Sequence, residues 1–128
     1  MNGTTADADL VVAEATLSIA EVARRAGVST NTVRFYERYS VVQSHRTSTN
    51  VRRFTIDAVC RLKLARAAQR VGLTLKESAE ILAEIPPMCP DLEKWTRAGQ
   101  RLVTAGRDRI AELESAVDEF RTFEFMRS

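Results

Sequence analysis

Residues 17–39, LSIAEVARRAGVSTNTVRFYERY, decide the fold of this chain. Ser18 precedes a run with helical apolar spacing, and Glu21 follows it by three residues, which is the pattern of a capping box. Gly27 is placed to end this first helix in the left-handed conformation, and Ser29 is placed to cap a second helix. Two short helices joined by a tight turn that contains glycine predict a helix-turn-helix. A plain αα-hairpin has the same spacing, so the spacing alone leaves both structures open.

The next segment changes from helical spacing to short apolar runs. Residues 41–43 and 51–54 are typical of short strands, and the polar stretch 44–50 joins them. We therefore expect a hairpin wing beside the helix-turn-helix. The tip of this hairpin holds no glycine, so the type of its turn stays open.

A second pair of helices follows the wing. Residues 57–70 show helical spacing, and Thr74 with Glu77 forms another capping-box pattern before a helix over 75–85. The sequence thus predicts one mainly α domain over 17–85, in which a winged helix-turn-helix is followed by this second helix pair.

Residues 91–123 predict one long helix, about 50 Å in length at 1.5 Å per residue. Its apolar residues recur at spacings of three and four, which is typical of a coiled coil. A single helix cannot bury such a stripe against a small domain, whereas two copies packed together can. We therefore expect a homodimer formed through this helix. The candidate dimerisation residues are Leu92, Trp95, Leu102, Ile110, Leu113, Val117 and Phe120.

Three further segments separate or flank these parts. Residues 1–16 show no sustained period and predict a flexible N-terminal tail. Residues 86–90, PPMCP, contain all three prolines of the chain and predict a hinge. Residues 124–128 are expected to form a short C-terminal tail.

The composition is that of an ordinary foldable chain. It is 45% hydrophobic and 28% charged over 128 residues, which argues against low-complexity and wholly disordered classes. No window holds about 18 uninterrupted apolar residues and no signal peptide is visible, so we expect a cytoplasmic protein with no membrane partner. Two cysteines are too few for a disulfide framework.

The net charge of +2 hides an uneven distribution along the chain. Residues 17–76 hold 12 Lys and Arg against 3 acids, whereas residues 77–128 hold 7 against 11. A basic block followed by an acidic one fits a module that binds a polyanion and is joined to a partner-binding element. On charge alone, nucleic-acid binding and an arginine-rich surface without a ligand both stay open.

Several motifs resemble the MerR family of transcription regulators. The core of the resemblance is Glu-Val-Ala at 21–23, Gly-Val-Ser at 27–29 and Val-Arg-Phe-Tyr-Glu at 33–37. Two further stretches, 45–54 and 65–75, are most similar to the SoxR branch of that family. The resemblance implies an antiparallel coiled-coil dimer that binds a palindrome in double-stranded promoter DNA and modulates transcription by distorting that DNA. It also implies RNA polymerase as a partner and a place at the bacterial nucleoid.

The second helix of the motif supplies candidates for reading bases. Thr30, Asn31 and Arg34 fall near its N-terminus, where side chains reach base edges in the major groove. Tyr36 can place its hydroxyl on a phosphate, and the alternative is a half-buried core tyrosine.

The resemblance implies a wing that follows the DNA backbone, with Arg46 and Arg52 as its best phosphate contacts. The chain departs from the family at Ser40 and Thr49, where glycine is usual and a positive φ is expected. The local turns, and with them the DNA sequence read, are therefore expected to differ. The full candidate DNA-binding set is Ser29, Thr30, Asn31, Arg34, Tyr36, Arg46, Ser48, Asn50, Arg52 and Arg53.

SoxR-like proteins hold a [2Fe–2S] centre on a C-terminal cysteine cluster, and this chain departs from them there. Its last residues contain no cysteine, and Cys60 with Cys89 cannot supply four thiolates. We expect no cofactor and no metal site. Cys60 is expected to be a small buried residue, whereas Cys89, just before the long helix, is a candidate sensor of thiol-reactive compounds.

Two other arrangements for sensing stay open. The apolar side chains near the C-terminus, together with Trp95, could line a pocket for a small organic effector at the dimer interface, or simply pack the end of the coil. The protein could also have no effector. The C-terminal side chains concerned are Phe120, Phe123, Phe125 and Met126.

The sequence favours a dimeric, sequence-specific DNA-binding transcription regulator. The alternative is an architectural or recombination accessory protein that uses the same winged helix without acting at a promoter. An enzyme is not expected, because no Ser/His/Asp set, paired carboxylates or phosphate-binding glycine loop is recognisable, and the single histidine lies in the wing.

Overall fold

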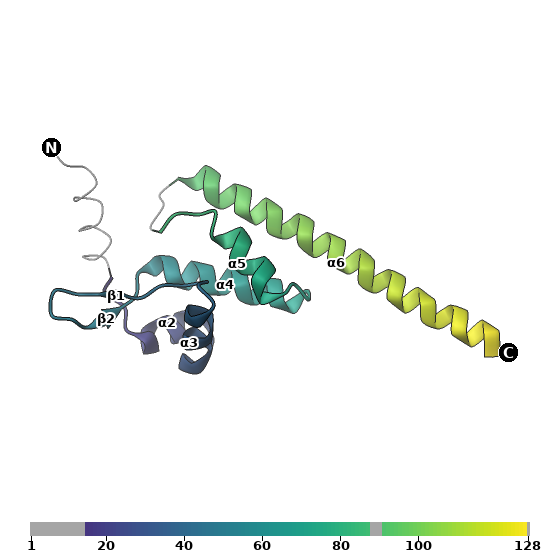
Figure 1. Ribbon diagram of the computed structural model, residues 1–128, viewed down its shortest axis with the longest axis horizontal. Helices are drawn as coiled ribbons and strands as arrows, with labels where there is room; N and C mark the ends of the chain where they lie inside the picture. The colour runs from purple at the N-terminus through teal and green to yellow at the C-terminus, as the bar shows by residue number, and fades with distance from the viewer. Residues whose placement is uncertain (1–14, 88–90, 128) are drawn as a thin grey trace.

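The computed structural model describes residues 15–87 and 91–127 and confirms a mainly helical chain with a small hairpin (Figure 1). Helices α2 to α5 and the hairpin form one packed domain, and the end of α6 projects far beyond it. The predictions for residues 1–14 and for Cys89 lie outside the described residues. In chain order the elements are α2 (Ile19–Ala26), α3 (Thr30–Arg38), β1 (His45–Arg46), β2 (Arg52–Arg53), α4 (Ile56–Arg70), α5 (Leu75–Leu82) and α6 (Leu92–Arg127).

The helix-turn-helix forms as its capping signals predict. The Ser18 hydroxyl accepts the Glu21 amide, and the Glu21 side chain accepts the Ser18 amide, so the capping box of α2 is confirmed. Gly27 ends α2 with a φ of 72°, a left-handed conformation that glycine adopts without strain. Ser29 caps α3 by accepting the Thr32 amide at 3.1 Å.

The wing differs from its prediction in where the first strand lies. β1 (His45–Arg46) pairs antiparallel with β2 (Arg52–Arg53), and the predicted strand over 41–43 is wrong. Val41 and Val42 are both buried, so this segment lacks the alternation that a strand with one exposed face needs. Instead, the Val41 amide donates to the Tyr36 carbonyl and closes the end of α3.

The two turns around the wing use positive φ without glycine. Ser40 has a φ of 63°, which confirms the expectation for that position. At the wing tip the left-handed residue is Asn50, with a φ of 62°, and not Thr49 as expected. Asparagine tolerates this conformation better than a β-branched threonine does, which explains the shift by one residue.

The second helix pair also forms, but its second helix is shorter than predicted. Gly72 turns the chain between α4 and α5 with a φ of 87°, and Thr74 and Glu77 form the predicted capping box. Helix α5 ends at Leu82 instead of residue 85, because the last residues before Pro86 continue as a tighter turn. The core between the two helix pairs and the wing contains Val22, Val33, Phe54, Leu62 and Leu82.

Helix α6 is longer than predicted and is used in two ways along its length. It continues to Arg127, so residues 124–127 are helical and not a tail, since no proline or glycine interrupts the helical sequence there. Its first half packs on α5 and the α4–α5 turn, where Ala98 is buried and Gly106 lies against Val71. Its second half runs on alone (Figure 1). No helix among residues 15–87 and 91–127 is long and apolar enough to cross a membrane.

A buried arginine joins α4 to the segment that leads into α6. Arg61 is only 7% exposed, and its Nε donates to the Asp57 carboxylate at 2.7 Å. Its two terminal nitrogens donate to the carbonyls of Leu82, Ile85 and Pro86. The guanidinium also lies 5.4 Å from the ring centre of Trp95 in α6.

Two more arginines of α6 fasten the helix to the domain. Arg101 pairs with Glu84, and Arg109 donates to the Gly72 carbonyl and to Glu77 at 3.0 Å. The hydrogen bonds from the Thr74 amide and hydroxyl, with the nearby Arg109, lower the pKa of Glu77. These contacts fix the direction of α6 relative to the domain.

The caps give a stability test. Ser18→Ala and Thr74→Ala should each lower the free energy of unfolding by about 1 kcal/mol, because each removes a side-chain cap. Thr55→Val at the start of α4 should cost less than either, because Thr55 makes no side-chain cap bond. Urea unfolding of the three variants tests this ranking, and a Thr55→Val loss as large as the others would contradict it.

Candidate nucleic-acid interface

The exposed face of α3 carries the residues expected to read bases. Asn31 and Arg34 are exposed on the first turns of the helix, and Thr30 beside them is half-buried. Arg34 Nη1 donates to Asn31 Oδ1 at 3.0 Å, which orients both side chains and leaves most guanidinium donors free. Ser29 has its hydroxyl committed to the cap, so its contribution is to shape the helix start.

Two aromatic residues extend this face, and sequence reasoning missed them. Phe35 and Tyr39 are exposed, one helical turn apart, with ring centres 4.9 Å apart. Their i, i+4 spacing beside Arg34 was the signal that could have found them. Apolar rings beside a recognition surface can contact thymine methyl groups and sugars.

Tyr36 does not belong to the exposed face, so the prediction that its hydroxyl contacts a phosphate is wrong. Its side chain is only 1% exposed and sits in the core. Its hydroxyl donates to Gln69 Oε1 of α4. Burial raises the pKa of Tyr36, while the charge of Arg66 opposes that rise. The residue therefore ties α3 to α4 and leaves no hydroxyl for DNA.

The wing presents the predicted polar and basic residues at its edge. Arg46, Ser48 and Asn50 are exposed, and Arg46 Nη1 donates to the Asn50 carbonyl across the turn at 3.2 Å. Arg53 is half-buried, on the hairpin face that it shares with its cross-strand partner His45. The tip thus keeps one exposed guanidinium and short polar side chains for a backbone contact.

Arg52 is bound to the recognition helix. Its guanidinium pairs with Glu37 of α3 and also donates to the Ser44 hydroxyl at 3.2 Å, while Ser44 donates to Glu37. Burial acts to raise the pKa of Glu37, but the hydrogen bonds from Arg52 and Ser44 outweigh it and hold that pKa below its ordinary value. This three-residue network sets the angle of the wing to α3.

Not every arginine of the basic block can face DNA. Arg61 is buried and satisfied within the protein, and Arg66, although exposed, donates to the Gly27 carbonyl at 3.2 Å. The excess of positive charge over 17–76 therefore overstates the charge available to a polyanion. The arginines that remain exposed on or before the recognition helix are Arg24, Arg25, Arg34 and Arg38.

The candidate dimerisation stripe divides into two groups. Trp95 and Leu102 are half-buried and pack against the core of their own domain. Leu92, Ile110, Leu113, Val117 and Phe120 are exposed, and so is Val103, which sequence reasoning missed one heptad before Ile110. The exposed set beyond the domain forms a row down one side of the free half of α6.

Of the candidate sensor residues, those whose side chains the structure describes do not come together within one chain. Trp95 lies against Arg61, and Phe120 is about 37 Å farther along the same helix at 1.5 Å per residue. Phe123 is exposed like Phe120, so one protomer does not build the suggested pocket. Cys60 is exposed on α4, and its predicted burial is wrong because it points away from the packed side of that helix.

Comparisons with known proteins agree on one family. Residues 17–85 match the model described as MerR HTH family regulatory protein. The chain is 32% identical over 101 residues to an HTH-type transcriptional activator SoxR homolog of Chromobacterium violaceum, which covers 78% of this chain and 68% of that protein. The match spans about half the length of two further relatives: 49% of the HTH-type transcriptional regulator CueR of Yersinia pestis and 46% of the mercuric resistance operon regulatory protein of Shigella flexneri.

Solved structures share the fold. A MerR family transcriptional regulator from Listeria monocytogenes has a TM-score of 0.57 and 26% identity over 84% of this chain and 82% of its own. HiNmlR, a MerR family regulator lacking the sensor domain and bound to promoter DNA, has a TM-score of 0.53 and 23% identity over 87% of this chain and 90% of its own.

The network around Glu37 predicts a pH-dependent stability. Because its pKa is lowered on folding, its contribution is present above the ordinary value of 4.5 and is lost as the pH falls through the lower folded pKa. Glu37→Gln should therefore destabilise the chain at pH 7, and the difference from wild type should shrink below pH 4.5. Urea unfolding at several pH values measures this, with exposed Glu80→Gln as the control. A difference that stays constant down to pH 3 would contradict the network.

Proposed function

The chain belongs to the MerR family of helix-turn-helix regulatory proteins, and we propose that it acts as a homodimeric transcription regulator that binds a palindromic promoter element and modulates transcription by distorting the DNA. The observation that carries the proposal is the pairing of two exposed features in one chain: a recognition helix with an adjoining wing, and an unburied apolar row on α6. The recognition helix and wing are suited to contact DNA, and the apolar row is suited to pack against the same row of a second copy.

The proposal assigns base reading to the first turns of α3. Arg34 can donate two parallel hydrogen bonds to guanine, and Asn31 can pair with adenine. The N-terminal end of α3 also favours a phosphate. No acidic residue stands in the first turn of α3, so no carboxylate repels DNA there.

The wing is assigned to the DNA backbone. Arg46 is exposed at its edge, and Arg52 lies on the exposed side of the Glu37 network. An exposed ion pair is worth only up to about 1 kcal/mol, so a DNA phosphate can replace Glu37 as the partner of Arg52. The same network would hold the wing at a fixed angle until DNA arrives.

Dimerisation is assigned to the free half of α6. Ile110, Leu113, Val117 and Phe120 repeat at spacings of three and four, as a coiled-coil seam requires. Antiparallel pairing of these segments would place the two domains at opposite ends of the pair. Two recognition helices held rigidly in this way can enter successive major grooves, about 34–36 Å apart.

Distortion of the DNA is the step by which the dimer would act on transcription. Bending and undertwisting a site cost several kcal/mol, and contacts from two wings and two recognition helices offset this cost. RNA polymerase at the promoter is the partner that would respond to the altered DNA.

The proposal includes no iron–sulfur centre and no other cofactor. A regulator of similar fold, HiNmlR, is described as lacking the sensor domain, which supports a MerR family regulator without one. A small-molecule or thiol-reactive effector, with Cys89 as its target, remains part of the proposal.

Two arginine variants separate base reading from backbone binding. Arg34→Ala should cost about 1–3 kcal/mol at the operator and reduce the preference over unrelated DNA, because it removes a base contact. Arg52→Ala should weaken binding to every sequence and flatten the salt slope by about 0.9, the value for one phosphate. Binding titrations at several salt concentrations test both. If both variants bound like wild type, the docking of α3 and the wing would be wrong.

A charge in the apolar row tests the dimer. Leu113→Glu should give a folded monomer whose affinity for a palindrome falls by more than about 100-fold, because two linked half-sites become one. Sedimentation velocity and DNA titration measure the two effects. Ala111→Glu, on nearly the opposite side of the helix, is the matched control and should stay dimeric. A dimeric Leu113→Glu variant would place the interface elsewhere.

A further inference from the structure

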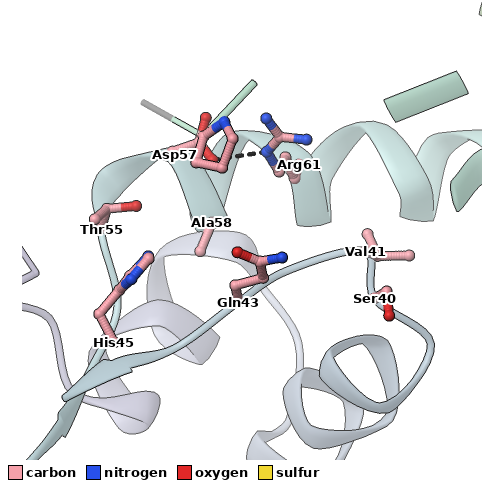
Figure 2. Close-up of a pocket in the computed structure, with 9 residues that line it drawn as sticks. Ser40, Val41, Gln43, His45, Thr55, Asp57, Ala58 and Arg61 are labelled. Atoms are coloured by element: carbon pink, nitrogen blue, oxygen red, sulfur yellow. Dashed lines mark hydrogen bonds and ion pairs between the residues drawn. The ribbon is translucent and has the colours of Figure 1, made fainter. Parts of the chain in front are cut away.

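A small polar pocket lies where the wing, the start of α4 and the linker after α5 meet (Figure 2). Gln43 and His45 line it from the wing side, Thr55 and Asp57 from the N-terminus of α4, and Pro87 from the linker. It lies apart from the exposed face of α3 that carries Asn31 and Arg34. No part of the proposed function uses it.

Thr55 contributes a polar side chain to this pocket. The residue is only 3% exposed, and its hydroxyl makes no side-chain cap bond with α4. Figure 2 shows this hydroxyl directed into the space between Asp57 and His45. The caps of α2, α3 and α5 all accept a backbone amide, so the 15-residue α4 alone among these helices begins without a side-chain acceptor.

The charged groups around the pocket leave room for an anion. The Asp57 carboxylate is paired with Arg61 at 2.7 Å, and the buried Arg61 is held by three carbonyls, so this pair is neutral and internally satisfied. Arg53 shares the hairpin face of His45 and adds a positive charge on that side.

The donors that remain point to an acceptor-rich occupant. The Thr55 hydroxyl, the first amides of α4 and the side chains of Gln43 and His45 can all donate hydrogen bonds. The side chains of Gln43 and His45 rise from the wing towards the start of α4 (Figure 2). Helix N-termini favour negative charge, and at the start of α4 Thr55 makes no cap bond, while the Asp57 carboxylate is paired with Arg61.

We propose that this pocket binds a small oxyanion, a carboxylate or a phosphate group, held by the Thr55 hydroxyl, the first amides of α4 and the His45 side chain. The oxyanion is either a free small anion or a phosphate of the DNA backbone. Because its walls come from the wing, α4 and the linker to α6, an occupant couples the position of the wing to the dimerisation helix.

The test uses the ¹⁵N-labelled full chain titrated with inorganic phosphate or acetate at constant ionic strength, with chloride as the reference. The amide signals of Ile56 and Asp57 should shift in a saturable way with a dissociation constant in the millimolar range. Thr55→Val should weaken this binding at least tenfold, and His45→Gln should also weaken it. Cys60→Ser, on the exposed side of α4, is the matched control and should bind like wild type.

A second arm separates the two sources of the oxyanion. If duplex DNA displaces phosphate from these amides and Thr55→Val weakens binding to every DNA sequence, the oxyanion is a backbone phosphate. If phosphate and DNA bind together and Thr55→Val leaves DNA affinity unchanged, it is a free anion. Either result supports the site. Amide shifts that do not saturate, or a folded Thr55→Val variant that binds both probes like wild type, would overturn it.

Discussion

The buried guanidinium of Arg61 is the interaction on which the arrangement of this molecule depends. A charge in the core loses its hydration and is tolerated only where partners surround it. Asp57, the carbonyls at the end of α5 and the ring of Trp95 supply those partners, from three segments at once. The start of α6 is therefore fixed to the DNA-binding domain. Any separation of two recognition helices in a dimer built through α6 is set at this point.

The basic residues of the first half of the chain have more than one task. Arg61 organises the core, Arg66 holds the turn of the helix-turn-helix, and Arg52 ties the wing to α3 through Glu37. A count of charges cannot separate these uses, because burial and partner choice are tertiary properties. What the count does indicate correctly is that the surface around α3 is positive, with Arg34 and its neighbours exposed.

Local signals account for the parts of the fold that sequence predicted well. The capping boxes at Ser18 and Thr74 and the turn at Gly27 depend on residues a few positions apart, so they can be recognised in the sequence. The wing strands are two residues each, too short for an alternating pattern to be visible, and the first strand was therefore predicted at 41–43 instead of 45–46. The direction of the Tyr36 side chain depends on its hydrogen bond to Gln69 of α4, 33 residues away in the sequence, and no local pattern shows such a contact.

Helix α6 shows why a heptad pattern can mislead about which residues meet a partner. An α-helix drifts relative to a strict seven-residue repeat, so one apolar stripe can turn from one neighbour to another along its length. The stripe begins at Trp95 and Leu102 against its own domain and continues at Ile110 and beyond on the free side. The change occurs near Arg109, which fastens the helix to the α4–α5 turn. Because one helix carries both the domain contact and the row proposed for dimerisation, a displacement at its domain end would be carried to that row.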